Sequence, residues 1–249
     1  MELSTVAIVT GASRGLGQAL ALGLLKPGTQ LITLARSHNA ALTTQAAKSG
    51  VLLQQVQADL ADPSAAAESA KQVMAALPRD AQRYLLINNA GTVEPINQAH
   101  DLTDAAAIAT AFNLNVTSVM LLISAFLQAT QGAADRRILN ISSGAGRNPM
   151  PGWGVYCATK AALDHYTQVL HAENHGVRVA SLAPGVIDTG MQEKIRGSDA
   201  NSFPNVERFA QMHEQGQLSS PEAVAEKILR YIAHDDFGAT VLDDIRNYA

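Results

Sequence analysis

The sequence predicts an α/β fold of the doubly wound type, in which helices cover both faces of a parallel sheet. Short, nearly continuous apolar segments alternate with longer segments of helical composition, and strands covered on both faces show such continuous runs. The repeated strand–helix order favours a parallel sheet. A turn with three glycines, Gly11, Gly15 and Gly17, joins the first strand to the first helix. We therefore expect a Rossmann-type, three-layer αβα architecture.

The alternation covers the first three quarters of the chain. Strands are expected at residues 6–10, 30–35, 52–57, 84–88, 137–142 and 177–183. Helices are expected between them at residues 16–25, 40–49, 64–77, 105–130 and 155–175. Most strand segments are rich in Val, Ile and Leu, and the helical segments are rich in Ala, Leu, Gln and Lys, in line with the preferences of these residues.

The alternation stops after the sixth strand. Residues 190–218 mix Gly, Asn, Ser, Pro and charged residues, which predicts a mobile, loop-like excursion. Ser220 as a cap and Pro221 in the first turn then predict a helix that extends to about residue 234. A short strand near residues 239–242 is expected to follow. Because no linker or repeat interrupts the pattern, we expect one domain over residues 1–249.

Composition and charge exclude several classes of protein. Of 249 residues, 47% are hydrophobic and 16% are charged, which excludes a disordered chain. The net charge of −4 offers no basic surface for a nucleic acid. Cys157 is the only cysteine, which excludes an internal disulfide and a cysteine-rich zinc site. His171 and His175 flank Glu173 in the wrong order for a metalloprotease, so no metal is expected.

The sequence gives no indication of a membrane or an export signal. No uninterrupted apolar run reaches the roughly 18 residues of a membrane span. The start of the chain, M-E-L-S-T-V-A-I-V-T, has no basic region before its short apolar run, unlike a secretory signal. We therefore expect a cytoplasmic protein without a membrane partner.

The glycine turn has the features of a dinucleotide-binding loop. Its glycines allow a tight turn, a close approach of the backbone to a pyrophosphate, and close packing of the helix on the strand. The N–H groups at the start of the following helix favour bound phosphates. The spacing G-x-x-x-G-x-G differs from the common G-x-G-x-x-G of Rossmann folds. An NTPase P-loop is excluded, because no Lys-Ser or Lys-Thr pair follows the glycines. The other loop residues expected at the cofactor are Ser13, Arg14 and Leu16.

The end of the second strand predicts NADP(H) as the cofactor. NAD-binding folds of this type place a carboxylate about 20 residues past the glycines, on the ribose 2′-hydroxyl. Here Arg36 lies 19 residues past Gly17, followed by Ser37. A guanidinium in this place can hold a 2′-phosphate through two parallel hydrogen bonds, and Arg14 can approach the same phosphate. The alternative is that both arginines are solvated surface charges.

Three residues further along the chain predict acid–base chemistry. Tyr156 and Lys160 are four residues apart in a helical segment, so they share one helix face. A nearby ammonium favours the phenolate and is expected to lower the pKa of the tyrosine from its usual value near 10. Ser143 follows the fifth strand, at the edge of the sheet where its hydroxyl can hold a carbonyl oxygen beside Tyr156. Without the glycine turn and Ser143, the tyrosine–lysine pair would indicate only an amphipathic helix.

Together these residues resemble the motifs of the short-chain dehydrogenase/reductase family, and the resemblance extends over essentially the whole chain. Further matching motifs are N-N-A-G at residues 88–91, Asn115 in the next helix, and P-G-V-I-D-T at residues 184–189. The resemblance implies that Ser143 orients the substrate carbonyl and that Tyr156 transfers the proton. It also implies that Lys160 lowers the pKa of the tyrosine and binds the nicotinamide ribose, and that Asn115 holds a water in the proton relay.

The resemblance implies further cofactor contacts. Asp59 is expected at the adenine, residues 88–91 at the adenosine, and residues 187–189 at the carboxamide. The individual residues expected at the cofactor, besides the glycine turn, Arg36, Ser37, Tyr156 and Lys160, are Asp59, Leu60, Asn88, Ala90, Gly91, Ile187, Thr189 and Met191.

Within this family, the chain is similar to sepiapterin reductases and bacterial benzil reductases. The similarity rests on G-W-G-V-Y-C at residues 152–157, D-T-G-M-Q at 188–192 and G-A-T-V at 238–241. Sepiapterin reductases have a pterin-binding aspartate directly after the last string, where this chain has Leu242 and then Asp243. The substrate contacts that we expect are therefore Ser143, Trp153, Tyr156, Gly185 and Asp243.

Residues 190–218 are expected to form a lid over the substrate. The segment follows the sixth strand, and ligands of open α/β sheets bind beyond the carboxyl ends of the strands. It carries Met191, Phe203, Phe209 and Met212, which favours a bulky aromatic or bicyclic substrate. Trp153 is expected either on the opposite wall of the substrate site or in structural packing.

We therefore predict an NADPH-dependent carbonyl reductase that acts on a small-molecule ketone or diketone. The alternative from another class is a catalytically inactive protein that senses NADP(H) and regulates a partner, which the complete set of Ser143, Tyr156, Lys160 and Asn115 disfavours. The apolar helix at residues 116–127 fits either burial or a subunit interface. We expect a homodimer or homotetramer.

Overall fold

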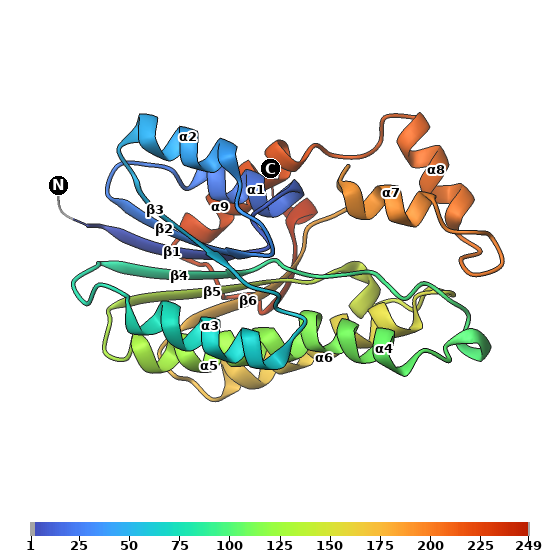
Figure 1. The fold of residues 1–249 in the computed structure, drawn as a ribbon, viewed down its shortest axis with the longest axis horizontal. Coiled ribbons are helices and arrows are strands. Elements are labelled where there is room, and N and C mark those ends of the chain that lie inside the picture. Colours follow the sequence, from blue (N-terminus) through green and yellow to red (C-terminus); the bar gives the residue numbers. More distant parts are fainter. Residues whose placement is uncertain (1–2, 249) are drawn as a thin grey trace.

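The sheet confirms the doubly wound α/β prediction. In a computed structural model that describes residues 3–248, seven strands form one parallel sheet of order β3-β2-β1-β4-β5-β6-β7 (Figure 1). The strands are β1 (Thr5–Thr10), β2 (Thr29–Ala35), β3 (Leu52–Gln57), β4 (Arg83–Asn88), β5 (Asp135–Ile141), β6 (Arg178–Ala183) and β7 (Leu242–Asp244). The chain reverses its direction of travel across the sheet between β1 and β4, and such switch points are where open α/β sheets bind ligands.

Helices form a layer on each face of the sheet (Figure 1). One layer consists of α1 (Gly15–Gly23), α2 (Ala40–Ser49) and α9 (Pro221–Ala233). The other consists of α3 (Pro63–Ala75), α4 (Ala105–Phe112), α5 (Ser118–Ala129) and α6 (Gly154–Ala172). Side-chain caps begin several of these helices: Asn39, Asp62, Asp104 and Ser220 each accept hydrogen bonds from first-turn N–H groups.

The two layers explain why the strands are almost continuously apolar. Successive side chains of a strand point to opposite faces. In β1, Ala7 and Val9 belong to the core under α1 and α9, whereas Val6 and Ile8 belong to the core under α3, α5 and α6. All four side chains are fully buried, so the strand needs apolar residues on both faces of the sheet.

The segment expected as one helix over residues 105–130 is divided into three parts. A π-helical turn, Asn113–Thr117, separates α4 from α5. By length and composition alone, residues 105–129 would pass as a membrane span, because an 18-residue window within them has a mean hydropathy of 1.8. A count of uninterrupted apolar runs does not anticipate this. Leu122, Ile123 and Phe126 of α5 lie in the core on the sheet, so the segment packs as a layer helix here.

The C-terminal quarter departs from the sequence-based expectation. Residues 190–218 were expected to be loop-like, but they contain α7 (Gly190–Arg196) and α8 (Val206–Glu214). Both helices lie beyond the carboxyl ends of the strands (Figure 1). The last strand, β7, begins at Leu242 rather than near residue 239.

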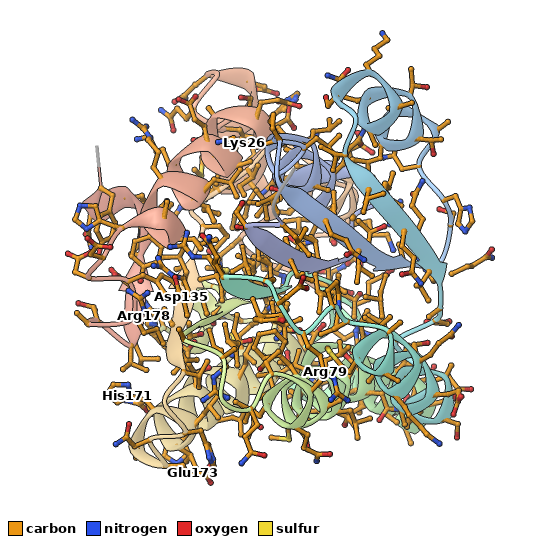
Figure 2. All side chains as sticks on the ribbon, turned by 90° about the vertical axis from the view of Figure 1, so that its left-hand side faces the viewer. Lys26, Arg79, Asp135, His171, Glu173 and Arg178 are labelled. Atoms are coloured by element: carbon orange, nitrogen blue, oxygen red, sulfur yellow. The ribbon has the colours of Figure 1, made fainter. Side chains whose placement is uncertain are left out.

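A cluster of charges lies at the opposite, amino-terminal edge of the sheet. Asp135 accepts hydrogen bonds from Arg83 (2.6 Å), Arg137 (2.9 Å) and Arg178 (2.8 Å). Figure 2 shows Asp135 and Arg178 together on this edge. Arg137 also donates to the carbonyl oxygens of Ile232 and His234 at the end of α9. The cluster therefore ties three strands to the last helix, away from the ligand-binding edge.

Candidate active site

A cavity of about 1430 Å³ extends along the carboxyl ends of the strands. Residues that follow each of the seven strands contribute to its wall. Single-ligand sites are typically about 300–1,000 Å³, so this cavity has room for a large ligand and a second molecule. Its lining includes the glycine turn and residues of α7 and α8.

The glycine turn has the geometry of a phosphate site. Gly11 and Gly15 have φ angles of +69° and +57°, which side chains rarely adopt. A Cβ on Gly17 would come within 2.3 Å of the carbonyl oxygen of Gly11, so only glycine lets the helix pack on the turn. The first turn of α1 has neither a side-chain cap nor an acidic residue, and its residues line the cavity. The free N–H groups and the positive end of the helix dipole therefore suit a phosphate ligand.

Two guanidinium groups accompany the glycine turn in the cavity lining. Arg14 and Arg36 both line it, and both are exposed. Among residues 3–248, neither side chain takes part in an ion pair. No carboxylate stands at the tip of β2, where Arg36 is followed by Ser37. Ser37 itself is exposed and does not line the cavity.

Most of the other expected cofactor residues also line the cavity. These are Ser13, Asp59, Leu60, Ala90, Gly91, Ile187, Thr189 and Met191. Asn88 is the exception: it is buried in β4, where its Nδ2 donates to Oδ1 of Asn140 at 2.8 Å. The neighbouring Asn89 does reach the site, because its side chain donates to the carbonyl oxygen of Thr10 and so fixes the glycine turn. The residues present therefore fit a dinucleotide.

Ser143, Tyr156 and Lys160 all lie in the cavity wall. Tyr156 and Lys160 stand one turn apart at the start of α6, and the Nζ of Lys160 is 5.8 Å from the centre of the Tyr156 ring. That Nζ donates to the carbonyl oxygen of Ile141 at 2.8 Å. Ser143 follows β5, and its hydroxyl is close enough to Tyr156 to act on the pKa of the phenol. A hydroxyl, a phenol and an ammonium therefore face the same cavity, where they can contact one bound molecule.

The pKa of Tyr156 is opposite to the expectation. Burial raises the pKa of Tyr156 to about 12, although the hydroxyl of Ser143 acts to lower it. The prediction that Lys160 lowers this pKa therefore fails for the protein alone, because loss of solvation dominates. Burial also lowers the pKa of Lys160 to about 8, against the opposing effect of Asp164. At neutral pH the phenol thus holds its proton, and the lysine is charged but close to its pKa.

Asn115 lies in the π-helical turn between α4 and α5, next to the helix that carries Tyr156 and Lys160. It is buried and does not line the cavity. Its Oδ1 accepts from the N–H of Thr92 at 2.8 Å, and its Nδ2 donates to the carbonyl of Thr92 and to the hydroxyl of Thr159. Single π turns are frequent at functional sites. This one turns Asn115 inward, where it holds the loop after β4 against α6.

The expected substrate end of the cavity is apolar and aromatic. Trp153, Phe203 and Phe209 form a buried cluster with Tyr156. Trp153 stacks on Phe203 with ring centres 4.9 Å apart, and its ring centre is 5.4 Å from those of Tyr156 and Phe209. Trp153 therefore lies against residues 190–218, not on the wall opposite them. Gly185, Met191 and Met212 also line the cavity.

Asp243 does not reach the cavity. Its side chain is buried, and its carboxylate accepts from the hydroxyl of Tyr248 at 2.5 Å. Because side chains alternate along a strand, Asp244 points the other way and does line the cavity, where it binds Arg246 through two hydrogen bonds. From the sequence, Asp243 is expected at the substrate and neither Asp244 nor Arg246 is singled out, since the register of so short a strand leaves no pattern in the sequence.

The described residues offer no metal site. No group of three or more His, Cys, Asp or Glu side chains within residues 3–248 could hold a metal ion. Figure 2 shows His171 and Glu173 at the exposed end of α6, at the opposite edge from the cavity. The ring Nε2 of His175 lies within hydrogen-bond distance of Oε2 of Glu173, at 2.9 Å.

Fold and site together define an oxidoreductase that binds a dinucleotide at the edge of a parallel sheet. The family model of short chain dehydrogenases matches residues 5–200. The chain belongs to the short-chain dehydrogenase/reductase family, which confirms the resemblance inferred from its motifs. Members use NAD(P)(H) and act on carbonyl or alcohol groups of small molecules, so the protein is an enzyme of this type.

Several known proteins are similar over nearly their whole length. A benzil reductase ((S)-benzoin forming) of Bacillus cereus is 37% identical, with 92% of this chain and 94% of that protein aligned. A sepiapterin reductase of Bos taurus is 37% identical, with 94% and 91% aligned. A short-chain dehydrogenase/reductase structure from Burkholderia vietnamiensis is 34% identical at a TM-score of 0.69, covering 99% of both chains. The KRED1-Pglu enzyme structure is 28% identical at a TM-score of 0.82, covering 95% and 99%.

Proposed function

We propose that the protein is an NADPH-dependent carbonyl reductase that converts a bulky ketone or diketone, similar to benzil or sepiapterin, to the alcohol. The observation that carries this proposal is the grouping of Ser143, Tyr156 and Lys160 in the wall of the cavity that begins at the glycine turn. The aromatic cluster beside Tyr156 supports a substrate with a ring system. The names of the relatives, benzil reductase and sepiapterin reductase, agree with that substrate class.

In this proposal the chain supplies the proton and the orientation of the carbonyl. Tyr156, with a pKa raised to about 12 by burial, holds its proton at neutral pH and donates it to the carbonyl oxygen. Ser143 donates a second hydrogen bond to the same oxygen. The ammonium of Lys160 stabilises the negative charge that develops on the phenol oxygen. The bound cofactor supplies the hydride.

The preference for NADPH over NADH rests on Arg14 and Arg36. Both guanidiniums line the cavity near the end of β2 without a carboxylate partner in the described chain. A 2′-phosphate would supply the missing anion and accept charge-assisted hydrogen bonds. The glycine turn, Asp59 and Thr189 would hold the rest of the cofactor.

A substrate screen tests the proposed function. The purified protein is mixed with NADPH or NADH and with benzil, sepiapterin or a small aliphatic ketone, and the absorbance of the reduced nicotinamide is followed. We expect turnover with NADPH and at least one of the two bulky substrates, and a much lower kcat/KM with NADH. Tight binding of NADPH without oxidation in any mixture would reject the enzyme proposal in favour of an NADP(H) sensor.

We also propose that the protein is a homodimer or homotetramer. The outer faces of α4, α5 and α6 leave Phe112, Met120 and Val169 exposed by 36%, 37% and 41%. Large exposed apolar side chains on neighbouring helices support a contact with another subunit. Light scattering of the eluting protein measures the mass, and a monomer at micromolar concentration would contradict this proposal. The cytoplasmic location stays a prediction.

A further inference from the structure

The turn that carries Ser143 is packed on α6 without any side chain between them. Ser143 begins a 3₁₀ turn, Gly144–Gly146, and its Oγ accepts from the N–H of Ala145 at 3.1 Å. A Cβ on Gly146 would lie 2.8 Å from the carbonyl carbon of Lys160 and 2.9 Å from its oxygen. Gly146 does not have a positive φ, so only the closeness of Lys160 requires glycine here.

The next residue, Arg147, ties the same turn to α6 a second time and also to β6 and β7. Its Nε donates to the carboxylate of Asp164 at 3.0 Å. Its Nη1 donates to the carbonyl of Asp243 in β7 at 2.9 Å, and its Nη2 to the carbonyl of Ser181 in β6 at 3.1 Å. A guanidinium provides such a fixed fork of donors, which an ammonium cannot reproduce.

Asp164 gives this connection a rigid anchor. It lies one turn beyond Lys160 on α6, its side chain is 6% exposed, and it also accepts from the hydroxyl of Ser181 at 2.6 Å. The carboxylate of Asp164 is thus shielded from water, whereas the side chain of Arg147 is 26% exposed. Gly146 and Arg147 together therefore hold the turn with Ser143 on the helix that carries Tyr156 and Lys160.

We propose that Gly146 and Arg147 are positioning residues, which set the distance between the hydroxyl of Ser143 and the phenol of Tyr156. The proposal rests on the proposed function, because it needs these two groups to act on one carbonyl oxygen. Neither residue needs to touch the cofactor or the substrate. Their loss should therefore lower kcat while cofactor binding remains, because a misplacement of about 1 Å in an active site can cost roughly 100-fold in rate.

Three variants and one matched control test this proposal. Gly146→Ala adds only the Cβ that collides with Lys160, Arg147→Met removes the fork, and Arg147→Lys keeps a positive charge without the fork. Arg178→Met is the control, because it removes one partner of Asp135 in the charge cluster at the far edge of the sheet (Figure 2). The measurements are kcat with the best ketone, the dissociation constant of NADPH by fluorescence, and the Tm.

We expect kcat to fall about 10- to 100-fold in Gly146→Ala and Arg147→Met, with NADPH affinity within threefold of wild type. Arg147→Lys should lose less than Arg147→Met. Arg178→Met should lower the Tm and leave kcat unchanged. A kcat loss in both variants no larger than that of the control, or a parallel loss of NADPH affinity, would overturn the proposal. If Arg147→Met does not fold, Gly146→Ala and Arg147→Lys decide by the same criteria.

A parallel Tyr156→Phe variant separates this inference from the proposed function. If Tyr156→Phe keeps wild-type turnover, the proposed proton donor is wrong and positioning of Ser143 against it has no meaning. If Tyr156→Phe is inactive but both turn variants are fully active, the function stands and only the positioning role is rejected.

Discussion

Lys160 stands one turn after Tyr156 on α6, with its Nζ 5.8 Å from the centre of the tyrosine ring. Its nearest polar partner is the backbone oxygen of Ile141, not a carboxylate. Burial therefore lowers the pKa of Lys160 to about 8, although Asp164 opposes the shift. The protein keeps a charged group where its own fold disfavours one, which is a common feature of functional sites.

This buried charge predicts a dependence of stability on pH. The pKa of Lys160 falls from 10.5 to about 8 on folding, so between these values the unfolded chain binds more protons than the folded protein. The contribution of Lys160 to the free energy of unfolding therefore rises with pH across this window, by up to about 3 kcal/mol.

Urea unfolding of wild type and Lys160→Met at pH 7 and at pH 10 measures this effect. The difference between the two proteins should shift in favour of wild type as the pH rises, because the buried ammonium loses its charge. Other titrating groups are the same in both proteins and cancel. A difference that does not change with pH would show that Lys160 is solvated.

Arg36→Ala should separate the two cofactors. Charge-assisted hydrogen bonds contribute roughly 1.5–3 kcal/mol each, so the dissociation constant of NADPH should rise about 10- to 150-fold. NADH should respond little because it lacks the phosphate. Arg79→Ala is a suitable control, since Arg79 is exposed at the amino-terminal edge of the sheet (Figure 2). Equal losses for both cofactors, or none, would refute the role of Arg36.

Phe209→Ala should weaken the aromatic end of the cavity. The ring of Phe209 packs on Trp153 at 5.4 Å and on Phe203 at 5.7 Å. Phe209 also lines the cavity, and an aromatic contact with a ring of the substrate contributes about 0.5–1.5 kcal/mol, so KM for benzil should rise several-fold. Steady-state kinetics with a small aliphatic ketone provide the comparison. The same loss of kcat/KM for both substrates would argue against Phe209 as a wall for ring systems.

Much of the fold follows from local patterns in the sequence. The β1 segment has apolar side chains on both faces of the sheet because one core lies on each side of it. The sequence alone shows this continuous apolar run. The turn at Asn113–Thr117 is different, because a π turn leaves the helical pattern of neighbouring residues intact. Helices α7 and α8 also escape prediction, since Gly190, Pro204 and Asn205 suggest a loop. Packing of Phe209 and Ile195 on Trp153 orders them instead.

The active site also has a part that the sequence predicts and a part that it does not. The sequence predicts the glycine turn, Tyr156 and Lys160, because the chemistry depends on the spacing of these residues. The raised pKa of Tyr156 could not be predicted, because a sequence shows the neighbouring charge but not the loss of solvation. Arg147 also gave no signal: its partners Asp164, Ser181 and Asp243 come together only through the order of strands in the sheet.

The most direct test of the account is the turnover of Tyr156→Phe with saturating NADPH and the best bulky ketone. The substitution removes one hydroxyl from a buried ring that keeps its contact with Trp153. Loss of a positioned proton donor typically costs about 10²- to 10⁴-fold in rate, so kcat should fall by that factor while the dissociation constant of NADPH stays within about threefold. A variant that reduces the ketone at close to the wild-type rate would contradict the assignment of Tyr156 as the proton donor.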